Sequence, residues 1–247
     1  MKYINVVIAY FNDTSGDDLS AAIKNDDFNK VKDLLNKGVS PDATDSLGRP
    51  ALFTAVLHEN IDIAEYLLQK GANANCVNYL YKSVLSQAVQ MDSLEISYDL
   101  AELLLSYGAD PNDTDSGKPL HIHAYINQKD EVAKLLIKHG AYINAEDNSG
   151  NTLLSYAIAE NDVEMVDFAL KNGACTDNIY VNGSKIKDLQ TIEKDIAELI
   201  EYYSKNKYKN HSSVVNAENN LDSHDNSFNN DKYFENTKEH IEWYATT

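Results

Sequence analysis

The sequence contains little cysteine, proline, tryptophan and arginine. Its 247 residues include two cysteines, four prolines and one tryptophan, and Arg49 is the only arginine among its 21 basic residues. Cys76 and Cys175 belong to no C-x-x-C pair, which excludes a dense disulfide framework and a zinc-finger spacing. A reducing compartment suits such a chain best, so we expect a cytoplasmic protein.

Long hydrophobic runs are also absent. A membrane-spanning helix needs about 20 consecutive apolar residues, and no stretch of the sequence reaches that length, so we expect no membrane insertion. The apolar residues near the start are interrupted by Asn5 and by two tyrosines, and no clean signal-peptide cleavage site follows them. We expect residues 1–16 to pack over the segment that follows.

Positive charge is scarce relative to negative charge. The chain has 39 acidic residues against 21 basic ones, a net charge of -18. Such a charge repels phosphate backbones at long range, so we expect no nucleic-acid partner. It favours a partner with a basic protein surface.

Recognisable catalytic and cofactor motifs are missing as well. The sequence has no Walker-type glycine loop, no G-x-S-x-G and no H-E-x-x-H. His121 and His123 are two residues apart and so do not share a helix face, which makes them a poor metal chelate. We therefore predict no catalytic, cofactor-binding or metal-binding residues, and no enzyme.

The most informative feature that is present is an internal repeat. Five segments each have an alanine near the start and a glycine at the end, and they open at Leu19, Leu52, Leu85, His121 and Leu154. The closing glycines, which are Gly38, Gly71, Gly108, Gly140 and Gly173, are separated by 33, 37, 32 and 33 residues. A fixed period of this length is the signature of a repeat architecture.

Each unit has the pattern of two short helices. In the second half of each unit apolar residues recur at three- and four-residue spacing, as in Ile63, Ala64, Leu67 and Leu68, which predicts one buried stripe. The closing glycine suits a left-handed residue that ends a helix. Pro50 and Pro119 fit a first helical turn and Thr152 fits a helix start.

These units resemble the ankyrin repeat. The resemblance rests on the 33-residue period and on phrases such as "KPLHIHA", "LLQKGANAN" and "LLSYGADPN", and it covers roughly residues 17 to 179. It implies an all-α solenoid of helix-turn-helix units joined by short β-hairpin loops, with a concave binding face. The expected organisation is an N-terminal segment 1–16, repeats 17–44, 45–77, 78–114, 115–146 and 147–179, a degenerate capping repeat 180–204 and a disordered polar tail 205–247.

Two units depart from the pattern. The third has four extra residues around "QMDSLEISYD", which we place between its helices. The hairpin that follows is one residue short, so either Leu120 or His121 could hold the signature leucine position, and we favour His121 because Ala124 is then in register.

The tip of the third hairpin is unusual. Where its sisters read "DSLGR" and "DNSGN", it reads "NYLYK", so Tyr79, Leu80 and Tyr81 replace a polar turn with a glycine. These side chains either cover neighbouring hairpins or anchor a partner, as interface tyrosines often do. The resemblance places the partner-binding residues at the hairpin tips and along the concave ends of the first helices, as follows: Ser46, Leu47, Arg49, Tyr79, Leu80, Tyr81, Lys82, Ser116, Lys118, Asn148 and Asn151 at the tips, and His58, Met91, Asn127 and Glu160 at the helix ends.

The resulting functional hypothesis is a non-enzymatic module that binds a protein partner. Two alternatives stay open at this point, which are an effector that an intracellular bacterium or a virus secretes into a host cell, and a self-associating scaffold. An enzyme with its catalytic element in the third-unit insertion or in the tail is a further class, but neither segment contains a recognisable constellation.

Overall fold

The structure is a computed structural model, and it describes residues 15–176, 179–181, 184–185 and 192–206. The chain divides into two units, Met1–Ser204 and Lys205–Thr247, and the description below concerns the first. The expectations for the N-terminal segment and for most of the tail lie outside the described residues.

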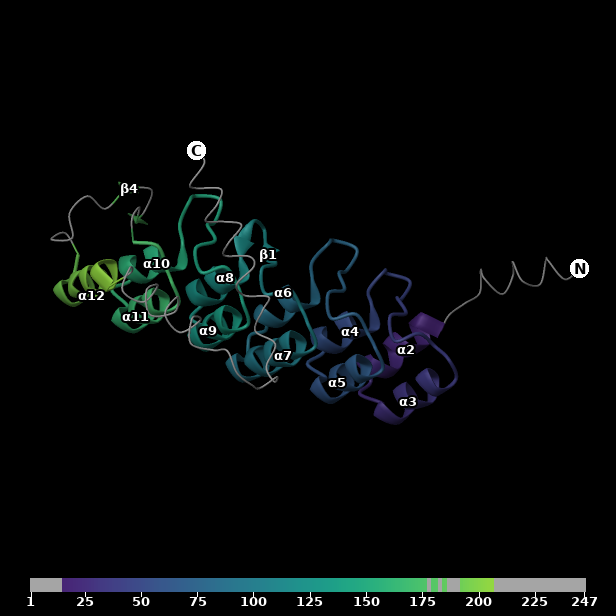
Figure 1. Cartoon of the computed structure of the whole chain (residues 1–247). Coiled ribbons are helices and arrows are strands. Elements are labelled where there is room, and N and C mark those ends of the chain that lie inside the picture. The colour runs from purple at the N-terminus through teal and green to yellow at the C-terminus, as the bar shows by residue number, and fades with distance from the viewer. Residues whose placement is uncertain (1–14, 177–178, 182–183, 186–191, 207–247) are drawn as a thin grey trace, which may run out of the picture. The chain divides into compact units, whose positions relative to one another are not determined.

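Five helix pairs follow one another along the chain. The first helix of each pair packs on the first helix of the next, and the second helices form a parallel row beneath them (Figure 1). The pairs are α2 (Ser15–Lys24) with α3 (Phe28–Asn36), α4 (Ala51–Leu57) with α5 (Ile61–Gln69), α6 (Val84–Val89) with α7 (Leu94–Ser106), α8 (Leu120–Ile126) with α9 (Asp130–Lys138), and α10 (Leu153–Ala159) with α11 (Val163–Lys171). This arrangement confirms the predicted all-α repeat fold.

The core runs through the whole stack between the two rows of helices. The apolar stripe of each second helix is buried, as at Ile63 and Leu67 of α5. One alanine in each of α4, α6, α8 and α10 is fully buried, namely Ala55, Ala88, Ala124 and Ala157. A methyl side chain at these positions lets adjacent helices approach closely. Each pair therefore covers the apolar face of its neighbour, which one pair alone could not bury.

The closing glycines end the second helices as predicted. Their φ angles lie between 85° and 97°, a region that costs a side-chain-bearing residue about 1–2 kcal/mol. At Gly71 the backbone then reverses so that Ala72 N–H donates to the Leu67 carbonyl at 3.0 Å. This bond satisfies a terminal carbonyl that would otherwise have no partner.

The helix starts also follow local sequence. Thr152 accepts a hydrogen bond from Ser155 N–H, and the Ser155 hydroxyl accepts one from Thr152 N–H, so the two residues cap α10 reciprocally. Pro50 and Pro119 lie one residue before the first helical turn, at the N-cap positions of α4 and α8. Helices α4, α6, α8 and α10 begin in register, which gives His121 the position of Leu52, Leu85 and Leu154.

The four extra residues of the third unit do not lie between its helices as expected. They lengthen α7, which has 13 residues where α5, α9 and α11 have nine. Four residues are close to one helical turn, so the apolar stripe of α7 stays on the same face. Ser97, in this added turn, is buried and donates to the Ala88 carbonyl at 3.0 Å.

Short hairpins connect the pairs, and a further segment follows the fifth pair. Thr44 bridges Pro50, Val77 bridges Ser83, and strand β1 (Thr114–Asp115) pairs antiparallel with β2 (Lys118–Pro119). After α11 come strands β3 (Tyr180–Val181) and β4 (Ser184–Lys185), also an antiparallel pair, and helix α12 (Lys194–Asn206). Tyr203 of α12 donates its hydroxyl to Asp167 of α11 at 3.1 Å, so α12 packs against the last pair.

Candidate partner-binding surface

Three of the hairpins are built around the side chain of their first residue. Asp45 Oδ1 accepts hydrogen bonds from the backbone N–H groups two and four residues later, at 3.0 and 2.9 Å. Asn78 Oδ1 does the same at 2.9 and 3.1 Å, and Asp147 Oδ1 at 2.8 and 3.0 Å. Aspartate and asparagine favour turns because their short side chains can bond the backbone in this way.

Tyr81 occupies the position that glycine holds in the sister turns. These turns need a left-handed residue three places after the first one, and Gly48 and Gly150 supply it with φ angles of 69° and 76°. Tyr81 adopts a φ of 60° at the same place. The third hairpin therefore keeps the turn of its sisters with a tyrosine where glycine is favoured, and it carries the associated backbone strain.

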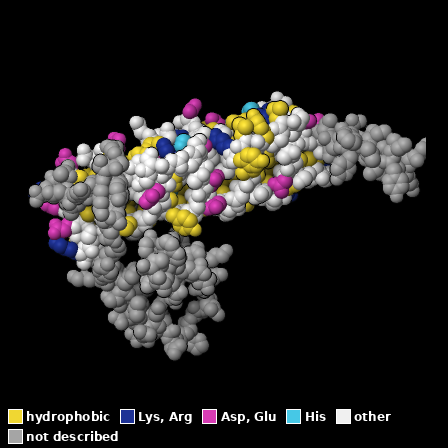
Figure 2. All heavy atoms as spheres, turned by 90° about the horizontal axis from the view of Figure 1, so that it is seen from above, with side chains coloured by type: hydrophobic (Ala, Val, Ile, Leu, Met, Phe, Trp, Pro, Cys, Tyr) yellow, Lys and Arg dark blue, Asp and Glu magenta, His cyan; other side chains and the backbone are white. Residues whose placement is uncertain are grey.

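Hydrophobic side chains cluster at the tips of the hairpins that open the second and third repeats, at residues 45–49 and 78–82, which we call the second and third hairpins. The exposed fractions are 60% for Leu47, 62% for Tyr79, 67% for Leu80 and 88% for Tyr81. The view onto the tips shows hydrophobic side chains gathered over the N-terminal half of the stack (Figure 2). Tyr79 lies beside the second hairpin, since its Cβ is 3.5 Å from where a Cβ at Gly48 would stand. We call these four residues the tyrosine patch.

The remaining tips are polar. In the β1–β2 hairpin Ser116 and Gly117 both have positive φ angles, which makes a tight turn one residue shorter than its sisters. Asn148 of the next hairpin donates to the Ser116 carbonyl at 3.3 Å. Lys118 and Asn151 are half-buried. A partner would thus meet an apolar surface at one end of the row of tips and a polar one at the other.

The two basic residues at the apolar tips are held within the fold. Arg49 donates to Asp45 Oδ2 at 3.0 Å from Nε and 2.7 Å from Nη2. Burial alone would raise the pKa of Asp45, but the hydrogen bonds from Arg49 and Leu47 outweigh it and leave this pKa lowered. Lys82 Nζ donates to Gln87 at 3.0 Å and to Gln90, and burial lowers the pKa of Lys82.

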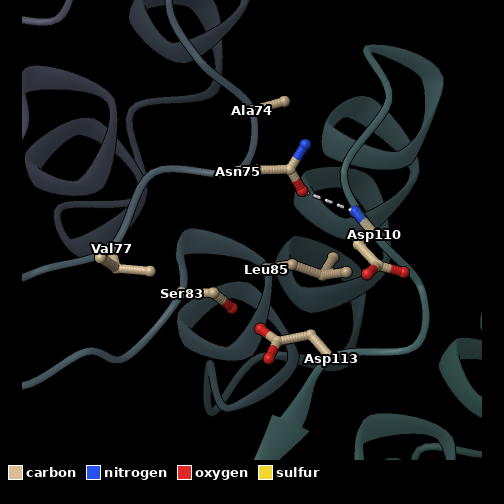
Figure 3. A pocket seen from close by; sticks show the side chains of 7 residues that line it. All are labelled: Ala74, Asn75, Val77, Ser83, Leu85, Asp110 and Asp113. Carbon is tan, nitrogen blue, oxygen red and sulfur yellow. Dashed lines mark hydrogen bonds between the residues drawn. The ribbon is translucent and has the colours of Figure 1, made fainter.

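A hollow of about 200 Å³ lies beside the stem of the third hairpin. Val77 and Ser83 stand on one side of it, Asp110 and Asp113 on the other, with Leu85 between them (Figure 3). The sequence analysis missed this hollow because its walls come from two successive units, and no spacing within one unit indicates them. The one sequence signal for this hollow was the pair Asp110 and Asp113 shortly after the closing Gly108.

Comparison with known proteins settles the family. The family model described as "Ankyrin repeats (3 copies)" matches residues 19–115 and 96–179. The chain belongs to the ankyrin repeat family. It is also similar to the crystal structure of an ankyrin repeat domain from Acinetobacter baumannii, with a TM-score of 0.63 and 27% identity over 75% of this chain and 97% of that one.

The ankyrin repeats of this chain are similar to parts of longer proteins. A putative ankyrin repeat protein of Acanthamoeba polyphaga mimivirus is 30% identical over 159 residues, which cover 52% of this chain and 21% of the viral protein. One from fowlpox virus is 30% identical over 63% of this chain and 36% of its own length. Human neurogenic locus notch homolog protein 2 is 34% identical over 60% of this chain and 6% of its own length.

Ankyrin repeats are generally protein–protein interaction modules, and the family is typically non-enzymatic. In the part of the chain that the structure describes, no three His, Cys, Asp or Glu side chains are grouped so that they could hold a metal ion. No helix among the described residues is long and apolar enough to cross a bilayer.

An asparagine ladder joins successive ankyrin repeats near the hairpins. Asn75 Nδ2 donates to the Gly108 carbonyl at 2.9 Å and Asn75 Oδ1 accepts from Asp110 N–H at 2.8 Å. Asn112 and Asn144 make the same two contacts to the repeats that follow them. Because each amide bonds both a closing glycine and the residue two places later, the ladder fixes the spacing of adjacent hairpins.

Of the four residues expected to be exposed at the helix ends, Met91 is buried instead. His58, Asn127 and Glu160 are exposed, whereas Met91 is only 6% exposed and belongs to the core. The connection between α6 and α7 is one residue longer than its sisters and turns Met91 inward. The carbonyl of Met91 accepts a hydrogen bond from Lys129, which also donates to the Val89 carbonyl at 2.8 Å. Lys129 is itself buried, and sequence reasoning gave no sign of this contact.

Proposed function

We propose that the chain is a non-enzymatic module that binds a protein partner through its hairpin tips, with the tyrosine patch as the anchor. The observation that carries the proposal is Tyr81, an 88% exposed tyrosine held at a φ of 60° where the sister turns have glycine. A strained, exposed aromatic residue contributes nothing evident to the fold. Contact with a partner would account for it.

The energetics of the patch suit an anchor. Aromatic side chains bury about 150–250 Å² each, so two tyrosines covered by a partner would contribute several kcal/mol at about 25 cal/mol/Å², before the cost of association. The exposed polar tips at Ser46, Ser116 and Asn148, with the half-buried Arg49, Lys82, Lys118 and Asn151, would form the rim. His58, Asn127 and Glu160 would extend the contact along the helix ends.

The partner is proposed to be a protein with a basic surface, and not a nucleic acid. The net charge of -18 supports this choice, since it speeds encounter with a basic surface and repels phosphate. Association should therefore slow as salt is added, because screening shortens the reach of the field.

Photo-crosslinking tests the proposed surface. A benzophenone side chain placed at Tyr79 or at Tyr81 in the full chain should form adducts with a cell protein, and the same group placed at Asp62 on the outer face of α5 should not. Equal adducts from all three positions would refute binding at the tips. The affinity of the crosslinked partner is then measured for the unchanged chain and for Tyr79→Ala/Tyr81→Ala. A loss of about 2 kcal/mol or more in binding free energy in the double variant would support the tyrosine patch as the anchor.

A finer role, that of an effector directed at a host protein, rests on the ankyrin repeat relatives in two viruses. For a bacterial source, fractionation of the cells tests it, because a bacterial effector must be found outside the cell that makes it. The self-associating scaffold makes a different prediction, namely a sedimentation coefficient that rises with protein concentration.

A further inference from the structure

The hollow and most of the tyrosine patch belong to the same hairpin, the hollow at its stem and the patch at its tip. Val77, which lines the hollow, bridges Ser83 at the stem of the hairpin whose tip carries Tyr79 and Tyr81. The Val77 side chain is also exposed. An extended segment that lies on the patch and runs down the hairpin would therefore pass over the hollow.

The hollow offers hydrogen-bond acceptors and negative charge. Asp113 Oδ1 accepts from Thr114 N–H at 2.7 Å and Asp110 Oδ1 from Asn112 N–H at 2.9 Å. In the described part of the chain neither aspartate is in an ion pair. Asp113 Oδ2 is buried and accepts no hydrogen bond from any described residue.

Such an oxygen is unfavourable until a donor reaches it. A buried acceptor without a partner carries its full desolvation cost, and the cost is larger for a charged group. Figure 3 shows the carboxylate of Asp113 directed across the hollow toward Ser83, with Asp110 on the same wall. A cationic donor that enters the hollow would offset the charge of this wall and supply a hydrogen bond to Asp113 Oδ2.

We propose that the hollow receives an arginine or lysine side chain of the protein partner, while an apolar residue next to it in the same segment lies on the tyrosine patch. This inference rests on the proposed function and adds to it the chemistry of the bound segment. The hollow is several times the volume of a water molecule, about 30 Å³, so it can hold the end of a side chain. The cations of the two hairpins that carry the patch are held by their own fold, Arg49 by Asp45, and Lys82 by Gln87 and Gln90.

A peptide selection tests the proposal. A displayed library of random peptides is selected on the full-length chain, and the affinities of enriched peptides are then measured by fluorescence anisotropy. We expect enriched peptides to contain arginine or lysine beside an aromatic or branched apolar residue. Asp110→Asn/Asp113→Asn should weaken their binding by about tenfold or more, since it removes the charge and keeps the shape.

The matched control removes the same charge elsewhere. Asp33→Asn/Asp62→Asn takes two negative charges from the exposed surfaces of α3 and α5, and it should change affinity by less than about threefold because these charges are exposed and screened. Unfolding of each variant in urea, followed by circular dichroism, confirms that the fold is intact. Asp113→Asn keeps the acceptor for Thr114 N–H, so we expect it to fold.

The outcomes separate this inference from the proposed function. The first outcome is that the enriched peptides bind Tyr79→Ser/Tyr81→Gly more weakly but have no excess of basic residues, or bind Asp110→Asn/Asp113→Asn as tightly as the unchanged chain. This outcome would overturn the inference and leave the proposed function standing. Peptides that bind the tyrosine variant as tightly as the unchanged chain would overturn both. A selection that enriches no peptide above an empty surface would also count against both.

Discussion

Replacing Tyr81 by glycine should make the protein more stable, although it removes a large aromatic side chain. Tyr81 has a φ of 60°, and the corresponding residues of the sister turns, Gly48 and Gly150, have φ angles of 69° and 76°. Glycine reaches this region without a clash because it has no Cβ. The change therefore relieves strain at a position where the family of turns in this chain already uses glycine.

The magnitude follows from three terms. A left-handed conformation costs a side-chain-bearing residue about 1–2 kcal/mol. Glycine gives back about 0.5–1 kcal/mol because it increases the conformational entropy of the unfolded chain. Since Tyr81 is 88% exposed, its removal loses little packing, and we expect a net gain of about 0.5–1 kcal/mol in the free energy of unfolding.

Urea unfolding followed by far-ultraviolet circular dichroism measures this change. The single tryptophan is Trp243, which lies outside the described residues, so circular dichroism reports the helical stack better than fluorescence does. We expect a higher urea midpoint with an unchanged slope, because the buried surface is the same. Partner binding should weaken in the same variant.

The reverse substitution is the matched control. A Cβ added at Gly150 would approach only Glu146, at 3.9 Å, so Gly150→Tyr introduces the strain without a backbone clash and should lower stability by about 0.5–1 kcal/mol. A loss of stability in Tyr81→Gly, with Gly150→Tyr neutral, would refute the reasoning. It would show that Tyr81 packs on its own fold.

Three further predictions concern the stack. Asn75→Ala should lower the free energy of unfolding by about 1–2 kcal/mol, because it removes the hydrogen bonds to Gly108 and Asp110. The control Asn148→Ala removes one 3.3 Å bond at an exposed tip and should cost less than about 0.5 kcal/mol. Equal losses in urea unfolding would contradict a stabilising role of the ladder. Burial lowers the pKa of His121 from 6.5 to about 4, so the unfolded chain binds more protons between these pH values and stability should fall by up to about 3 kcal/mol as the pH is lowered through them. His121→Leu, with the residue found at the other four opening positions, should abolish that part of the slope. An unchanged pH profile would argue against a buried neutral His121. Burial raises the pKa of the Cys76 thiol to about 12. A thiol reagent at pH 8 should therefore label only the exposed Cys175 in the native chain, and both cysteines in urea. Two fast-reacting thiols in the native chain would mean that the core around Cys76 opens.

Much of the fold could be predicted from the sequence because its signals are local. The closing glycines predicted where the second helices end, since only glycine takes the left-handed conformation there without strain. The alanines and the apolar spacing predicted which faces are buried. The position of His121, which the sequence left open between two alignments, was decided by the common starting register of α6, α8 and α10.

Other features depend on which repeats are neighbours. The sequence showed that the "NYLYK" tip is unusual, but the left-handed backbone of Tyr81 and the exposure of its side chain came from the structure. The burial of Met91 and the hydrogen bonds of Lys129 to the carbonyls of Val89 and Met91 depend on how the longer connection folds back. A helical spacing pattern cannot show whether extra residues lengthen a loop or a helix, because one added turn preserves the pattern.

The sequence by itself determined the repeating helix pairs, their ends and the tyrosines at one hairpin tip, because propensity, periodicity and turn chemistry act within about one repeat. Only the tertiary structure decided which side chains of successive repeats meet. The hollow between Val77 and Asp113 and the ladder through Asn75 arise from residues more than 30 positions apart in the sequence, where contact is set by the stacking of whole units and not by any local pattern.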